Sequence, residues 1–328
     1  MRLGLSGRAL AYALTLLAAI SFNFFLPRAM PGDPLELIAG NAVRQMGAER
    51  IEALRQQYGL DKPLSEQFVI YLGQLLRGDL GQSYRYSGGQ TVVQVLADRF
   101  LWTFFLVTAS LGLATFIGAS LGVWAVWRRN RKRDLGLLTA LFTLRSVPPF
   151  WLAMLLIPLL AVRYDIFPTG DSYSIPRPEG WAGVVDVLHH AALPIIILTL
   201  AYVPTAFALM RTSMLGLSDS DFVRTARSKG LQEGRVVTRH ALRVALLPLL
   251  TALALEFGQL LGGVTLIETV FNYRGLGNMM FEAVKSRDYP LLQGGFLLFT
   301  LGVLAINLMT DWLYPRLDPR VRGGEAGS

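Results

Sequence analysis

The 328-residue sequence contains no cysteine and has few charged residues. Without cysteine, the chain has no disulfide, no thiolate metal site and no thiol nucleophile. Charged residues make up 16% of the chain, against about 25% in ordinary soluble domains, whereas 52% of the residues are hydrophobic. The missing charge indicates either a very large core or a surface that faces lipid.

The motifs of several enzyme classes are also missing. The sequence has no G-x-x-x-x-G-K-[ST] nucleotide-binding loop and no H-E-x-x-H metal-binding helix. No membrane-embedded serine–histidine pair is evident, so we expect no catalysis by this chain and no cofactor or metal bound to it. The formal net charge of +8 does not by itself indicate nucleic acid, because in a membrane protein the location of the basic residues matters more than their sum. We expect no nucleic-acid partner.

The apolar residues gather in about six runs of roughly 20 residues each, the length that crosses a hydrocarbon core about 30 Å thick. Backbone groups in hydrocarbon must be hydrogen-bonded within their own segment, so the runs predict helices and an all-α integral membrane fold. The first run could instead be a signal peptide, but it is long and no small-residue cleavage site follows it. The predicted spans lie near residues 9–29, 101–127, 136–162, 191–215, 242–267 and 291–314, with the first helix in the region 1–30.

Basic residues are concentrated in alternate connections between these runs. The block WRRNRKRD at residues 127–134, the connection after the fourth run and the tail at 316–328 are all rich in arginine. Since lysine and arginine favour the cytoplasmic side, we expect both termini, including the tail 316–328, to be cytoplasmic in a multi-pass plasma-membrane protein.

The segment 31–100 is then external. Ala48–Leu60 has helical spacing and ends on a glycine stop signal, and Ser65–Leu76 places apolar side chains on one face. These patterns predict an ordered helical cap at the N-terminal side of the protein rather than a flexible tether. The apolar face of the second helix is formed by Phe68, Tyr71, Leu72 and Leu75.

The connection between the fourth and fifth runs, residues 216–243, contains a short capped helix. Residues 218–220 supply N-cap candidates, Asp221 places an acid in the first turn, and Gly230 is a natural stop. A helix of about nine residues is not stable alone in water, so it must dock against something. Its basic residues suit anionic lipid headgroups, whereas Phe222 and Ala226 among the charges suit the groove of a partner protein. The residues alone leave both possibilities open.

The same connection carries a family resemblance. DFVRTARSKG at 221–230, followed by RHALRVALLP at 239–248, resembles the cytoplasmic loop of permease subunits of ATP-binding-cassette (ABC) importers in the dipeptide, oligopeptide and nickel family. Further blocks resemble this family in order along essentially the whole chain. They are PGDP (31–34), YGLDKPLSEQF (58–68), LLRGDLGQSY (75–84), VPPFWLAMLLI (147–157), GGVTLIETVFNYRGLG (262–277), SRDYPLLQG (286–294) and DPR (318–320). The chain departs from the family at Arg274, where proline is usual, and at Arg145, where the span is usually less charged.

This resemblance implies a type I ABC importer permease (MetI-like) bundle, with the core permease domain at 101–315. It also implies four partners: a second homologous permease, two ATPase subunits that bind ATP and Mg²⁺, an external solute-binding protein, and the membrane lipid around this chain. The implied location is the plasma membrane of a bacterial or archaeal cell. The implied cargo is a di- or oligopeptide, with nickel chelates or oligosaccharides as alternatives. A stand-alone channel or secondary transporter is the alternative from another class.

In that family the helix of the cytoplasmic loop is the coupling helix, which inserts into a cleft of the ATPase subunit. Carried over by position, Gly230→Pro or Arg227→Glu is expected to abolish uptake and leave the protein in the membrane. The residues that the resemblance assigns to ATPase coupling are Asp221, Phe222, Arg224, Thr225, Ala226, Arg227, Lys229 and Gly230.

Ionisable residues within the apolar runs are candidates for the pore or its gate, because such groups are unfavourable in lipid and face the bundle interior. Arg145 lies in the third run, Glu256 near the centre of the fifth, and Glu268 at its outer end. Gly258 and Gly262 leave room beside Glu256, so that Glu256 either faces the pore or forms an internal ion pair, with Arg145 as a possible partner.

Glycine and proline also mark the predicted spans. Gly118 and Gly122 are four residues apart, as are Gly258 and Gly262, and small residues at this spacing allow helices to pack closely. Prolines at 148–149, 194, 204 and 248 predict kinks that suit a translocation path.

Overall fold

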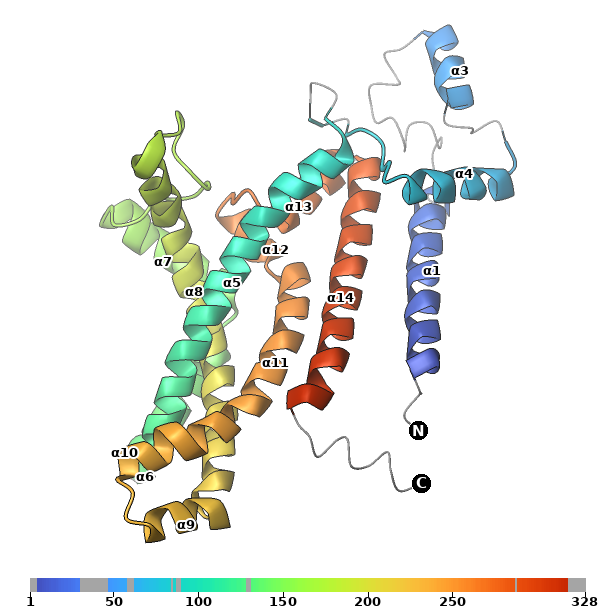
Figure 1. Cartoon of the computed structure of the whole chain (residues 1–328). Helices are drawn as coiled ribbons and strands as arrows, with labels where there is room; N and C mark the ends of the chain where they lie inside the picture. Colours follow the sequence, from blue (N-terminus) through green and yellow to red (C-terminus); the bar gives the residue numbers. More distant parts are fainter. Residues whose placement is uncertain are drawn as a thin grey trace. The chain divides into compact units, whose positions relative to one another are not determined.

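The computed structural model describes residues 5–29, 47–57, 62–83, 85–86, 90–127, 131–286 and 288–317 (Figure 1). Over these residues the chain is helical, and its only β-pairing is an isolated bridge between Gln82 and Thr91. The predicted all-α fold is therefore confirmed. The PGDP block at 31–34 and the DPR block at 318–320 lie outside the described residues.

The chain divides into two compact units. The first consists of Met1–Thr103 and Arg274–Ala305, and the second of Phe104–Tyr273 and Ile306–Ser328. Two long helices, α5 (Val92–Trp127) and α14 (Tyr289–Leu317), contribute to both units.

In the first unit, α1 (Leu5–Ala29), α3 (Ala48–Gln57) and α4 (Leu64–Leu76) form where helices were predicted. The predicted apolar face of α4 packs on the end of α1, where Phe68 and Tyr71 lie 5.1 and 5.4 Å from Phe24 between ring centres. A reciprocal amide pair joins α1 to α14. The side-chain amide of Asn23 donates to the carbonyl of Gln293 at 2.7 Å, and that of Gln293 donates back to the carbonyl of Asn23 at 3.0 Å.

A buried carboxylate organises the turn between α13 (Leu276–Ser286) and α14. Asp288 is 1% exposed. Its oxygens accept hydrogen bonds from the Ser83 hydroxyl (2.5 Å), the Arg85 backbone (3.1 Å) and the Leu291 backbone (3.2 Å). The last of these satisfies an amide in the first turn of α14, where backbone donors have no partner within the helix. Asp288 thereby fixes the segment around residue 83 to the start of α14.

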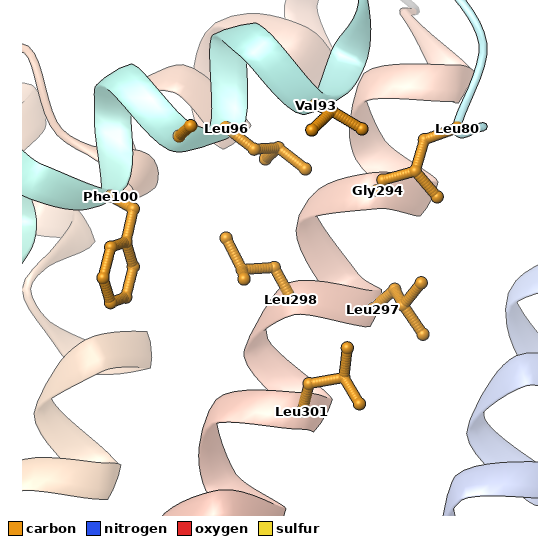
Figure 2. A pocket seen from close by; sticks show the side chains of 9 residues that line it. Leu80, Val93, Leu96, Phe100, Gly294, Leu297, Leu298 and Leu301 are labelled. Carbon is orange, nitrogen blue, oxygen red and sulfur yellow. The ribbon is translucent and has the colours of Figure 1, made fainter. Parts of the chain in front are cut away.

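The start of α5 packs on the first turns of α14 around Gly294. A Cβ atom at Gly294 would lie 2.5 Å from Val92 Cγ1, so only glycine permits this approach without a shift. Beside the contact is an apolar pocket of about 270 Å³, in which Leu96 and Phe100 of α5 face Leu298 of α14 (Figure 2).

In the second unit, α5 packs directly on the backbone of α8 (Gly180–Ser218). A Cβ at Gly118 would lie 2.7 Å from both Ala206 Cβ and the carbonyl oxygen of Val203, and one at Gly122 would lie 2.9 Å from Met210 Cβ. Both values are shorter than real Cβ contacts. The packing role predicted for this glycine pair is confirmed. The surroundings of the second pair, Gly258 and Gly262, are not among the described features, so its packing role stays a prediction.

The third predicted span, 136–162, is not one helix. The structure has α6 (Arg131–Arg145), then α7 (Pro149–Leu156), which continues as the π-helical η2 (Ile157–Arg163), and the two parts are bent by 87°. The break falls at Pro148–Pro149. Proline lacks the amide that a helix interior needs and disfavours helical backbone in the preceding residue, so the helix is interrupted at the prolines for which a kink was predicted. By contrast, α8 continues through Pro194 and Pro204.

Within the part of the chain that the structure describes, four helices can cross a membrane by length and composition: Val92–Trp127, Gly180–Ser218, Glu233–Phe257 and Tyr289–Met309. The bent pair would make a fifth, and the apolar stretch of α1, Leu10–Phe25, is shorter. At about 1.5 Å per residue, the 39 residues of α8 extend to roughly 58 Å, about twice the hydrocarbon thickness. Hydropathy predicted only 191–215 of this helix.

Candidate functional site

The short helix predicted in the 216–243 connection is α9 (Asp221–Ser228), drawn at the end of α8 in Figure 1. Ser220 occupies the N-cap position, but its hydroxyl donates to the carbonyl of Leu217 at 2.6 Å and does not cap the helix. The backbone carbonyl of Ser220 instead accepts from Val223 and Arg224. The start of α9 is thus fixed to the last turn of α8.

The end of α9 is a Schellman motif built on Gly230. Gly230 has φ of +76°, in the left-handed region that glycine adopts without strain. Its amide donates to the carbonyl of Arg227 at 2.9 Å, and the Leu231 amide donates to that of Ala226 at 3.4 Å. These are the two bonds of the motif, and the predicted stop at Gly230 is confirmed.

Two of the eight residues of α9, Val223 and Ala226, are buried. They are three apart and therefore lie on one face of the helix. That face packs on a hydrophobic cluster in which α5, α8, η3 (Val236–Ala241) and α11 (Leu242–Gly263) all take part. Since α9 is too short to be stable alone, this contact is what keeps it helical. The buried members contributed by the other elements are Val126, Ala206, Met210, Met214, Val236, Val237, Ala241, Ala245 and Leu249.

The opposite side of α9 is exposed and of mixed polarity. Phe222 is 41% exposed, in a helix whose remaining exposed residues are polar or charged. The Thr225 hydroxyl is satisfied by the carbonyl of Asp221 at 2.8 Å. This surface therefore presents one large apolar side chain in a polar setting. Its members are Asp221, Phe222, Arg224, Thr225, Arg227 and Ser228, with Lys229 and Gly230 following.

Arg227 differs from the other exposed residues because it is held within the chain. Its guanidinium donates to Glu233 of α10 (Glu233–Arg235) and to the carbonyl of Ser218, and it lies over the ring of Trp127. Neither Glu233 nor Trp127 was predicted from the sequence. Trp127 is 100 residues from Arg227 along the chain, and no local pattern signals such a contact.

A second ion pair at this end of the unit joins α6 to α8. Arg211 donates through Nε and Nη2 to the two carboxylate oxygens of Asp134, at 2.7 and 2.5 Å. The side chains are about one-fifth exposed. Two parallel bonds between planar groups fix orientation as well as distance. This pair was also not predicted.

The pore candidates lie on three different helices. Arg145 is the last residue of α6 and is exposed, whereas Glu256 is half-buried in α11. The charges of these two residues interact, and Tyr202 of α8 is a further ionisable neighbour of Glu256. The predicted alternatives for Glu256, a pore-facing group or an internal ion pair with Arg145, both stay predictions.

Glu268 lies on a separate helix. It is fully buried in α12 (Thr265–Val270), and its backbone carbonyl accepts from the Tyr273 amide at 2.7 Å. Burial, with a smaller contribution from the nearby Glu268 carboxylate, raises the pKa of the Tyr273 phenol. No group of three or more histidine, aspartate or glutamate side chains in the described part of the chain is arranged to hold a metal ion.

The second unit also contains a large apolar cavity of about 960 Å³ between α5 and α11. Thr115 and Ser120, two of its polar members, donate their hydroxyls to carbonyls one turn earlier in α5, at 2.6 and 2.7 Å. With these hydroxyls satisfied, the cavity offers an apolar wall along several turns of a membrane-length helix. Phe104 and Phe257, 5.7 Å apart between ring centres, lie on this wall from α5 and α11.

Comparison with known proteins gives matches over nearly the whole chain. The family described as binding-protein-dependent transport system inner membrane component matches residues 114–323, and its N-terminal companion family matches residues 2–107. The glutathione transport system permease protein GsiC of Pectobacterium atrosepticum is 38% identical over 316 residues, covering 96% of this chain and 97% of that protein. A putative peptide permease protein of Brucella ovis is 36% identical over 318 residues, covering 97% of both chains. GsiC of Escherichia coli O6:H1 is 36% identical over 315 residues, covering 96% of this chain and 97% of that protein.

Proposed function

Because the chain belongs to the family of binding-protein-dependent transport system inner membrane components, we propose that it is a permease subunit of an ATP-driven importer and that its cargo is a short peptide. The names of its relatives, which are glutathione and peptide permeases, support the peptide class over nickel chelates or oligosaccharides. The chain forms half of the translocation pore, and a second, homologous permease forms the other half.

The importer's energy comes from partner subunits, because this chain has no nucleotide-binding loop. Two ATPase subunits hold ATP and Mg²⁺ on the cytoplasmic side. An external solute-binding protein delivers the peptide to the opposite side, where the segment 31–100 lies. Both termini are cytoplasmic in this arrangement.

The observation that carries the coupling assignment is the two-sided character of α9. Its inner face, Val223 and Ala226, is packed on a cluster that includes α8 and α11, and its outer face presents Phe222 among charged groups. An exposed aromatic side chain within a polar surface is typical of an interface anchor. We assign α9 as the coupling helix, with Phe222, Asp221, Arg224 and Thr225 in contact with the ATPase. Closure of the ATPase pair then displaces α9, and the buried face transmits that displacement to α8 and α11.

The peptide passes on the inner side of the membrane helices. The cavity of about 960 Å³ between α5 and α11 supports this part of the proposal, because ligand sites typically have volumes of about 300–1,000 Å³. An apolar wall with few charges suits the passage of varied side chains. Arg145, Glu256 and Glu268 are the charged candidates for pore or gate, and Gly258 and Gly262 leave space beside Glu256.

The proposal is tested by expressing the tagged chain with its chromosomal neighbours and identifying what co-purifies in mild detergent. We expect a second permease and P-loop ATPases. Phe222→Ala should lower the yield of co-purified ATPase, whereas Trp181→Ala should not, because Trp181 is 77% exposed at the opposite end of α8. Purification as a homo-oligomer without any ATPase would contradict the proposal and favour a channel or secondary transporter.

The substrate class is tested with the same complex and the binding protein. Short peptides, including glutathione, should stimulate ATP hydrolysis, whereas a nickel chelate or an oligosaccharide should not. Stimulation by either of the latter alone would keep the importer assignment and overturn the peptide assignment.

A further inference from the structure

Arg227 lies on the exposed side of α9 and yet makes three contacts inside the chain. Its Nε donates to Glu233 Oε1 at 2.9 Å, and its Nη1 donates to the carbonyl oxygen of Ser218 at 3.3 Å. Its guanidinium carbon lies 5.4 Å from the centre of the Trp127 ring. Ser218 is the last residue of α8, Trp127 the last of α5, and Glu233 the first of α10. One side chain therefore joins the ends of three helices to α9.

We propose that Arg227 is a positioning residue that makes α9 move together with the ends of α5, α8 and α10, rather than a residue that binds the ATPase. This inference rests on the proposed coupling function of α9. The buried face of α9 holds the helix on the hydrophobic cluster. Val223 and Ala226 are small, however, and an apolar contact does not fix the orientation of the helix as a hydrogen bond does. The hydrogen bonds and the cation–π contact add direction, and they fix how the C-terminal half of α9 is oriented.

The chemistry of the site requires arginine. A guanidinium donates in its plane to two acceptors while its face lies on an aromatic ring. A lysine ammonium can satisfy a carboxylate or approach the ring, but it lacks the flat fork that makes all three contacts together.

Arg224 provides an internal comparison. It lies three residues before Arg227 in the same helix and is also exposed. Within the described residues, no hydrogen bond or ion pair joins its side chain to the rest of the chain, so it remains available to a partner. The two arginines of α9 therefore differ: Arg224 is exposed, whereas Arg227 contacts the ends of other helices.

The test uses the complete importer in proteoliposomes with its binding protein. Three quantities are measured for each variant: the ATPase that co-purifies, the peptide-stimulated ATP hydrolysis, and the ATP consumed per peptide imported. For Arg227→Met we expect co-purification close to that of the unaltered chain, and more ATP consumed per peptide imported than by the unaltered importer. The ATP consumed per peptide by Arg227→Lys should lie between that of the unaltered chain and that of Arg227→Met.

Two further variants separate positioning from direct binding. Arg227→Glu faces Glu233 with a like charge, and adding Glu233→Arg restores the pair with its charges exchanged. Because Arg227→Glu is expected to abolish uptake, we expect the double variant to restore measurable peptide import. Arg224→Met, the matched comparison, should instead lower ATPase co-purification.

The inference is overturned if the charge exchange gives no recovery, or if Arg227→Met loses the ATPase as Arg224→Met does. Unchanged coupling in Arg227→Met would also overturn it. If no ATPase co-purifies even with the unaltered chain, the proposed function itself fails, and this outcome is distinct from the others.

Discussion

The contact between α5 and α8 gives a graded prediction, because three glycines of α5 differ in what an added methyl group would meet. At Gly118 a Cβ would lie 2.7 Å from the Val203 carbonyl oxygen and 2.8 Å from the Phe207 amide nitrogen, both of them backbone atoms that cannot rotate away. At Gly122 the nearest atoms would be 2.9–3.0 Å away. At Gly112, in the same helix, nothing lies within 4 Å.

The change in unfolding free energy expected for Gly118→Ala follows from two opposing effects. Overpacking typically destabilises by about 1–3 kcal/mol. Replacing glycine by alanine within a helix recovers up to about 1 kcal/mol through lower backbone entropy in the unfolded chain. Because the clash is with backbone, we expect a net loss of about 1–2 kcal/mol, a smaller loss for Gly122→Ala, and a neutral or slightly favourable effect for Gly112→Ala.

The assay is thermal unfolding of the purified chain in detergent, followed by tryptophan fluorescence. The expected order of melting temperatures is Gly118→Ala below Gly122→Ala, and both below Gly112→Ala. If Gly118→Ala melts at or above the unaltered protein, or if the three variants are indistinguishable, the close contact of α5 with the α8 backbone is refuted.

Three further changes test single contacts. Gly230→Ala forces a non-glycine residue to φ of +76° with no steric clash, so α9 should lose about 1–2 kcal/mol of local stability, seen as faster amide exchange in this helix; unchanged exchange would contradict the Schellman assignment. Asp134→Asn removes the charge that Arg211 binds through two hydrogen bonds and should lower the free energy of unfolding by about 1.5–3 kcal/mol. An unchanged melting temperature would contradict a stabilising role of this ion pair. Asp288→Ala leaves the Ser83 hydroxyl and two backbone amides without their acceptor. It should lower the free energy of unfolding by about 1–3 kcal/mol, measured by the same unfolding assay. If proteolysis near residue 83 were no faster than in the unaltered protein, Asp288 would not fix this segment.

Local signals predicted α9 well. The Gly230 stop and the apolar positions of α4 lie within a few residues of the structure that they determine, so composition and spacing were sufficient. The same holds for Gly118 and Gly122, whose spacing indicates close packing. The helix that pairs with them, α8, could be identified only from the structure.

Other features were set by contacts between distant parts of the chain. The proline pair at 148–149 was recognised as a break, but the 87° bend was not, because the angle at a break depends on tertiary packing, and α7 packs on α8 and α12. Hydropathy located the centre of α8 and missed its first eleven residues, which include the charged Asp186. The contacts of Arg227 with Trp127 and Glu233 depend on helix ends meeting in space, which no periodicity encodes.

The most direct test of the central assignment, that α9 contacts the ATPase, uses the absence of cysteine from the chain. Phe222→Cys and Trp181→Cys each introduce one thiol, to which a photo-crosslinking maleimide is attached before the complex is illuminated in membranes. The proposal predicts an adduct with the ATPase subunit from Phe222→Cys and none from Trp181→Cys. The assignment would be contradicted if Phe222→Cys gave no ATPase adduct, or if both positions gave adducts of equal strength.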